Sequence, residues 1–143
     1  MNNNIENLIT NKQFKEAKNL ILEELSNKEN DLELLKNLGL CQVNLEDFKS
    51  AQDTFSKVIE LNPDDATAYF YSAFLNEKNK NKEQAIAHYK KVIELYPENP
   101  AAYFNLGSAY QIQQKHDEAI ELFKKAVELD DEDESFQIGR AHV

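Results

Sequence analysis

The chain has 143 residues, of which 41% are hydrophobic and 29% charged, a composition typical of a folded protein rather than a disordered one. Its 16 basic residues face 26 acidic ones, and its lysines are scattered along the chain, so we expect no nucleic-acid partner. No apolar run approaches the ~20 residues needed to cross a bilayer, which predicts no membrane span. Three glycines, three prolines and no tryptophan leave little material for a turn-rich sheet and favour an all-α chain.

The first 31 residues carry two short helical patterns that imitate the repeats described next. A shortened first helix is indicated by Ile5, Leu8 and Ile9, and a second one by Phe14, Ala17, Leu20 and Ile21. Because a terminal repeat has one face in water, it is usually atypical. We interpret residues 1–31 as degenerate N-terminal capping helices.

Three gap-free repeats of 34 residues follow, at 32–65, 66–99 and 100–133. In each repeat a polar break separates two apolar stripes of helical period, which predicts a helix, a short turn and a second helix. Neither helix can bury its stripe alone, so we expect antiparallel helix pairs that stack into a solenoid. The second stripe of each repeat carries an alanine at the same place: Ala51, Ala85 and Ala119.

Two glycines occupy equivalent places in the first helices of two repeats, Gly39 and Gly107, and Ala73 stands there in the third. Glycine inside a helix costs ~1 kcal/mol relative to alanine, so its recurrence indicates a steric demand. We predict that the paired helix approaches closely at this point, with the recurring alanines as the contact.

The prolines fall where helices are expected to begin or end. Asn62-Pro63 and Asn99-Pro100 each offer an N-cap residue followed by proline at the first helical position. Pro97 follows the second helix of its repeat and cannot extend it.

The end of the chain differs in character from the rest. Arg140 is the only arginine, and residues 137–143 resemble the translation of a sequencing adapter. We therefore interpret 134–143 as the start of a truncated segment plus an artefactual tail. An ordinary C-terminal tail is the alternative.

The repeats resemble those of the tetratricopeptide repeat family. They share its 34-residue period, a bulky residue near the start, Leu-Gly or a small equivalent, and a small–aromatic–small pattern in the second helix. The middle repeat departs from the family pattern at Ser72 and Asn76, and the first repeat at Gln42. The resemblance implies an all-α, right-handed superhelical solenoid of antiparallel helix pairs.

The resemblance also implies a function. Members of the family are protein–protein interaction scaffolds that bind a peptide segment in a concave groove lined by the first helices. By equivalence, the groove residues are Lys36, Asn37, Leu40, Phe70, Tyr71, Phe74, Phe104, Asn105 and Ser108. The alternative is a helical accessory region of a larger enzyme or of a secretion or assembly complex, whose remaining part is missing from this fragment.

The partner's chemistry follows from these residues. Amides such as those of Asn37 and Asn105 can hold a peptide backbone, and the aromatic rings between them supply apolar contacts. The acidic charge favours a protein or peptide that is basic or neutral and carries apolar anchors. We also expect self-association through an uncapped C-terminal repeat, because Ile120, Val127 and Leu129 would be left exposed.

Catalytic chemistry finds little support. No histidine has a second metal-ligating residue at a suitable spacing, so we expect no metal, no cofactor and no enzymatic activity. Cys41 lies among leucines and is predicted to be a buried thiol. As the single cysteine it can form no internal disulfide, which favours a reducing compartment, the cytoplasm.

Overall fold

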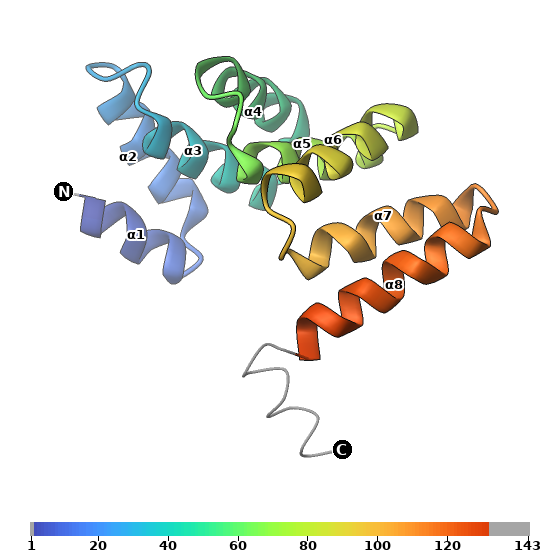
Figure 1. Ribbon diagram of the computed structural model, residues 1–143. Coiled ribbons are helices and arrows are strands. Elements are labelled where there is room, and N and C mark those ends of the chain that lie inside the picture. Colours follow the sequence, from blue (N-terminus) through green and yellow to red (C-terminus); the bar gives the residue numbers. More distant parts are fainter. Residues whose placement is uncertain (1, 132–143) are drawn as a thin grey trace. The chain divides into compact units, whose positions relative to one another are not determined.

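The computed structural model describes residues 2–131, and within that range every regular element is an α-helix (Figure 1). The all-α prediction is confirmed. The segment 134–143 and its expected tail lie outside the described residues. The helices are α1 (Asn2–Thr10), α2 (Phe14–Leu25), α3 (Leu32–Asn44), α4 (Phe48–Leu61), α5 (Ala66–Lys78), α6 (Lys82–Leu95), α7 (Pro100–Ile112) and α8 (His116–Asp131).

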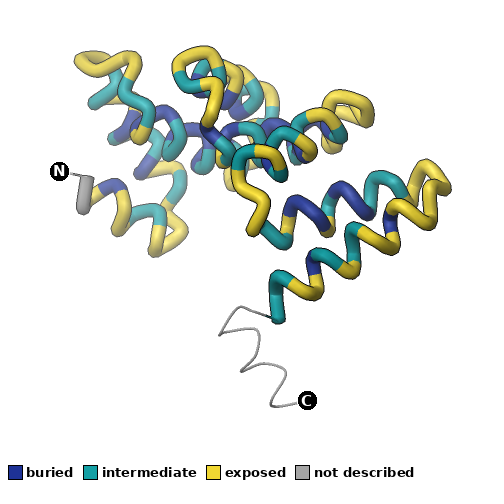
Figure 2. The backbone as a smooth tube through the Cα atoms, in the orientation of Figure 1, coloured by how far each residue is buried: buried dark blue, intermediate teal, exposed yellow. Residues whose placement is uncertain are grey.

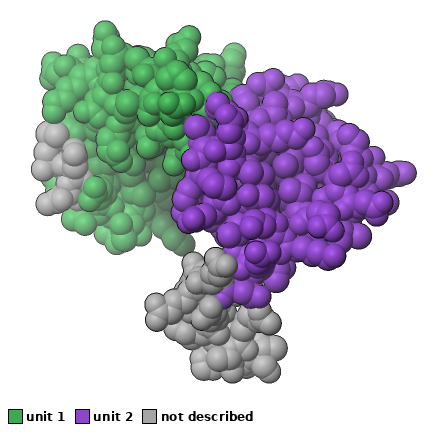
Figure 3. Space-filling model, in the orientation of Figure 1, with its two compact units in different colours: residues 1–75 green, residues 76–143 purple. Residues whose placement is uncertain are grey.

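The chain divides into two compact units, which Figure 3 shows in green and purple. Unit 1 is Met1–Leu75 and unit 2 is Asn76–Val143, so the boundary falls inside α5. Within unit 1, α1 packs on α2, α2 on α3 and α3 on α4. Within unit 2, α6 packs on α7 and α7 on α8.

Unit 1 has two apolar clusters, each built from the buried stripes of successive helices (Figure 2). The first joins α1, α2 and α3 through Ile5, Ala17, Ile21, Leu34, Leu38 and Cys41. The second joins α3, α4 and α5 through Leu35, Ala51, Phe55, Val58, Ala68 and Leu75. Burial of such side chains contributes roughly 1.5–3 kcal/mol each, which is why a helix pair needs its neighbour.

In unit 2 the recurring alanines Ala85 and Ala119 are again buried, at 1% and 2% exposed. Burial therefore agrees with the repeat register derived from the sequence. The other buried apolar side chains of this unit are Tyr89, Val92, Ala102, Tyr103, Leu106 and Ala126.

The two helical glycines lie against aromatic rings. A Cβ atom on Gly39 would stand 2.5 Å from the ring of Phe55, and one on Gly107 would stand 2.9 Å from the ring of Phe123. The backbone carbonyl of Ala119 is the next contact at Gly107, at 3.3 Å. The predicted close approach exists, but its main cause is the aromatic ring of the second helix rather than the alanine.

One helix start was predicted in the wrong place. The chain does not enter a helix at Pro63: Asn62 ends α4, and α5 begins at Ala66. The Asn62 side chain accepts a hydrogen bond from the amide of Asp64 at 3.3 Å, which makes a turn. Asp65 then accepts from the amide of Ala68 at 3.0 Å and takes the capping role.

The other asparagine–proline pair is confirmed as a helix start. Asn99 is the N-cap of α7, its side chain accepts from the amides of Ala101 and Ala102 at 3.0 and 3.3 Å, and Pro100 is the first helical residue. Pro97 lies just beyond α6, as expected.

Each helix pair turns through a residue with a left-handed backbone, and this turn recurs every 34 residues. The four residues have φ angles of 60° to 63° and none is glycine: Lys12, Glu46, Lys80 and Gln114. After each, the next amide donates to the carbonyl five residues back, as from Asp47 to Gln42 at 2.9 Å. This is the Schellman ending of a helix, made here without glycine.

The polar departures from the repeat pattern are all hydrogen-bonded. Gln42 accepts from the hydroxyl of Thr54 at 2.7 Å. Ser72 is fully buried and accepts from the amide of Gln52 at 3.0 Å. Asn76 accepts from the side chain of Asn81 at 3.4 Å. Because their polar groups have partners, these residues are tolerated inside the fold and α5 remains a complete helix.

Candidate binding surfaces

The nine predicted groove residues fall in both units. Six belong to unit 1, on α3 and α5, and three belong to unit 2, on α7. The α3 residues are Lys36, Asn37 and Leu40; the α5 residues are Phe70, Tyr71 and Phe74; the α7 residues are Phe104, Asn105 and Ser108.

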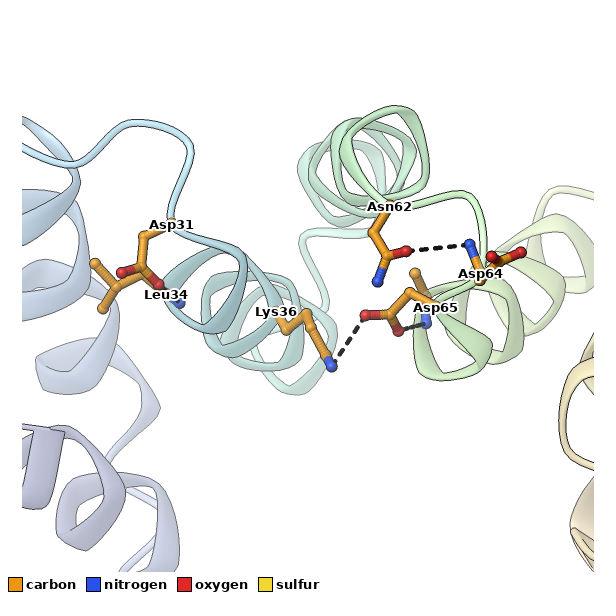
Figure 4. Close-up of polar contacts among 7 residues, drawn as sticks. Asp31, Leu34, Lys36, Asn62, Asp64 and Asp65 are labelled. Atoms are coloured by element: carbon orange, nitrogen blue, oxygen red, sulfur yellow. Dashed lines mark hydrogen bonds and ion pairs between the residues drawn. The ribbon is translucent and has the colours of Figure 1, made fainter.

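Lys36 is held by an ion pair inside unit 1. Its ammonium lies 3.0 Å from the carboxylate of Asp65, whose side chain is only 8% exposed (Figure 4). The same carboxylate accepts the amide of Ala68 in the first turn of α5. Lys36 therefore ties α3 to the start of α5, and its charge is already matched.

The three aromatic side chains of α5 pack partly against other rings of unit 1. Tyr71 stacks on the buried Phe55, with ring centroids 5.0 Å apart and planes 9° apart. Burial raises the pKa of the Tyr71 hydroxyl. Phe70 meets Tyr71 edge-on at 5.9 Å, and Phe74 meets Phe48 edge-on at 6.4 Å. All three rings of α5 are half-buried, so much of their surface serves the fold.

In unit 2, the three predicted residues of α7 line one groove. Phe104 is 55% exposed, and its ring centroid lies 5.5 Å from that of Phe123 on α8. The groove between α7 and α8 has a volume of about 650 Å³. Its lining is Pro100, Ala101, Phe104, Asn105, Ser108 and Gln111 from α7, with Phe123, Ala126, Val127 and Asp130 from α8.

A second hollow of about 470 Å³ adjoins this groove along α8 and shares Phe123 and Val127 with it. Ile120 lines it and is 49% exposed, and Val127 is 53% exposed. The predicted exposure of these two residues is confirmed, whereas Leu129 is half-buried. We name the two hollows together the α7–α8 surface.

Asn105 has a structural contact as well as a place in the groove. The hydroxyl of the buried Tyr89 donates a hydrogen bond to the carboxylate of Glu77. Burial, followed by the contact with Glu77, raises the pKa of Tyr89, and a hydrogen bond with the Asn105 side chain opposes that shift. The amide of Asn105 thus supports a buried hydroxyl, which sequence reasoning did not reveal because Tyr89 lies 16 residues away in the chain.

Cys41 is fully buried, as predicted. Burial raises the pKa of its thiol to about 11, against a smaller lowering by Lys18. Between residues 2 and 131, no three or more His, Cys, Asp or Glu side chains are grouped so as to hold a metal ion. Over the same range, no helix has both the length and the apolar character needed to cross a membrane.

Three family models match parts of the chain. Two models described as tetratricopeptide repeat match residues 32–65 and 100–133, and one described as TPR repeat matches residues 75–114. No curated protein sequence matches the chain.

Several solved structures are similar to this chain. One is a crystal structure of MamA, 24% identical, with a TM-score of 0.82 over 89% of this chain and 74% of that one. Another structure of MamA is 26% identical, with a TM-score of 0.79 over 87% of this chain and 68% of that one. YrrB, described as a TPR protein with an unusual peptide-binding site, is 24% identical, with a TM-score of 0.76 over 95% of this chain and 70% of that one. These likenesses show the fold, an all-α solenoid of helix pairs.

Proposed function

The chain belongs to the tetratricopeptide repeat family, and from that premise we propose that it binds a peptide segment of a partner protein along the first helices of its repeats. Repeats of this family serve as protein-interaction scaffolds in general, and they are typically not catalytic. The observation that carries the proposal is the exposed ring of Phe104 in a groove that Asn105 and Ser108 also line.

The groove suits an extended segment with an apolar anchor. Apolar surface left in water costs about 25 cal/mol per Å², so a partner side chain that covers the Phe104 ring gains that energy. Ser108 and Gln111 supply hydroxyl and amide groups along the same helix, which can donate to and accept from a peptide backbone. In unit 1, the half-buried Asn37 and Leu40 are the proposed contacts on α3.

Charge selects the partner. The protein carries a net charge of −10, so a basic or neutral segment is attracted and an acidic one repelled. Because such steering is screened by salt, binding of a basic segment weakens as ionic strength rises.

The test is a peptide-library screen on the full chain, followed by affinity measurements with Phe104→Ala. We expect the selected peptides to carry an aromatic or aliphatic anchor with lysine or arginine beside it, and Phe104→Ala to weaken them by about tenfold, as for a hot-spot aromatic. The matched control is Ile112→Ala, which removes an equally exposed apolar side chain from the other end of α7 and should leave affinity unchanged. Selection of acidic peptides, or equal binding by both variants, contradicts the proposal.

Two further points belong to this proposal. The buried, unpaired thiol of Cys41 suits a reducing compartment, and we place the protein in the cytoplasm on that ground. Self-association through the C-terminal repeat stays a prediction, which sedimentation velocity over a range of concentrations tests.

A further inference from the structure

The structure contains its own example of a helix resting on a helix pair. In unit 1, α5 lies against α3 and α4, and three of its side chains make defined contacts with α4. Tyr71 stacks on Phe55, and Ser72 accepts a hydrogen bond from Gln52. Phe74 meets Phe48 edge-on. Phe55, at the centre of these contacts, is completely buried.

The repeat relates this arrangement to unit 2 by a shift of 68 residues. Under that shift Gln52 corresponds to Ile120, Phe55 to Phe123, Ile59 to Val127 and Lys36 to Phe104. In unit 1, Phe55 is completely buried and Gln52 and Ile59 are half-buried. In unit 2, Phe123 is half-buried, and the other three residues form an exposed apolar rim around it.

We propose that the α7–α8 surface binds an α-helix of a partner protein in the position that α5 takes in unit 1. This inference goes beyond the extended segment proposed above, because it concerns a helix and depends on Ile120, Phe123 and Val127. The two hollows, of about 650 and 470 Å³, adjoin at Phe123 and Val127 and offer the helix a continuous apolar bed.

The substitutions between the two units specify the face of the incoming helix. An aromatic residue stacks on Phe123, as Tyr71 does on Phe55. The next residue is aliphatic, because Ile120 has replaced the amide of Gln52 that met a serine. The residue near Phe104 is uncharged, because no lysine stands there to pair with an aspartate as Lys36 does.

Charge at the end of α8 adds a basic requirement. Its last turn contains no basic residue, and Asp130 lines the groove. The carboxyl end of a helix also carries partial negative charge. In unit 1 the helix that covers the pair begins just after the preceding helix ends, so the partner's residues before its own first turn lie beside this acidic end. Lysine or arginine is favoured there.

A second copy of this chain is a poor occupant. Its first helix, α1, carries Asn4 and Asn7 at the places where α5 has Ser72 and Leu75, and both asparagines are exposed. Head-to-tail stacking would set these amides against Ile120 and Val127 and leave them without partners. The net charge of −10 on each copy opposes the contact further.

The experiment uses a labelled, end-capped peptide that consists of two lysines followed by residues 66–79 of this chain. One form keeps the native residues and the other carries Ser72→Leu. Fluorescence anisotropy measures binding to the full chain, and circular dichroism measures helix gained by the peptide. We expect the Ser72→Leu peptide to bind at least fivefold more tightly than the native form and to become helical when bound.

Variants of the protein locate the site. Ile120→Gln restores the amide of unit 1 and should reverse the preference, so that the native peptide with Ser72 becomes the tighter one. Val127→Lys should weaken both peptides at least tenfold, and Leu22→Lys, at an equally exposed apolar residue of α2, should weaken neither. Ile120 and Val127 are half exposed, so these variants are expected to keep the native melting temperature.

Several results overturn the inference: no binding of either peptide, a preference indifferent to Ile120→Gln, or a wild-type dimer that Val127→Lys converts to monomer. The last would assign the surface to a second copy. Binding of the extended segments should survive Val127→Lys, so loss of helix binding alone leaves the proposed function intact. Loss of the Phe104-dependent segments alone removes the proposed function and leaves the helix site.

Discussion

The same substitution at two equivalent glycines should have different consequences, because the ring that each glycine faces has different freedom. Gly39→Ala places a methyl group 2.5 Å from the Phe55 ring, and Gly107→Ala places one 2.9 Å from the Phe123 ring. Ordinary carbon contacts are 3.5–4.0 Å, so the Phe55 ring must retreat by roughly 1 Å and the Phe123 ring by somewhat less.

Phe55 has nowhere to go. It is completely buried, and Tyr71 stacks on its face at 5.0 Å, so the added methyl overpacks the core. Overpacking of this kind costs about 1–3 kcal/mol. Phe123 is half-buried beside an open groove of about 650 Å³ and can turn towards it. Both substitutions gain about 1 kcal/mol of helix propensity, and this gain cancels in the comparison.

We therefore expect Gly39→Ala to be less stable than Gly107→Ala by about 1–3 kcal/mol, with Gly107→Ala near or above the wild-type stability. Urea unfolding of the full chain, followed by circular dichroism, measures both variants against the wild type. The slopes must agree, so that the midpoints report stability rather than a change in cooperativity. Equal midpoints for the two variants would refute the reasoning that the burial of the ring, rather than the glycine itself, sets the cost.

Three more predictions test other parts of the fold. Gln114→Gly and Glu46→Gly should each stabilise the protein by about 0.5–1 kcal/mol in urea unfolding, because both sites have left-handed backbones that side chains disfavour. Ala119→Leu should cost about 1–3 kcal/mol, since that site is 2% exposed; an unchanged melting temperature would contradict the repeat register. The pKa of Cys41, raised to about 11, should protect the thiol from alkylation at pH 8 until the protein is unfolded. Because the folded pKa exceeds the model value of 9.0, this thiol's contribution to stability should fall as pH rises from 9 to 11.

The repeat period predicted most of the fold because it carries the same apolar pattern three times in one register. A single pattern is ambiguous, but equivalent alanines that are buried in every repeat leave one arrangement of helix pairs. The helix starts were harder to predict. Asn62-Pro63 and Asn99-Pro100 are the same dipeptide, and what separates them is a third residue, Asp65, which competes successfully for the cap.

The left-handed turns carried no sequence signal at all. Lysine, glutamate, lysine and glutamine stand where glycine or asparagine would be expected in a Schellman ending. The turn is imposed by the packing of the two helices that it joins, and each residue there adopts a backbone that its type disfavours. Local propensity cannot predict a conformation that tertiary contacts enforce.

The binding residues were predicted by equivalence alone, and equivalence does not determine what a side chain does. Lys36, Phe70 and Phe104 occupy one position in successive repeats. Lys36 forms an ion pair with Asp65, Phe70 packs edge-on to Tyr71, and Phe104 is exposed beside a groove. Each role is set by the neighbour that the position meets: a carboxylate or a ring in unit 1, and the groove beside α8 in unit 2. A repeat position therefore marks where a contact can form, and only the surrounding side chains decide whether the contact stabilises the fold or remains open to a partner.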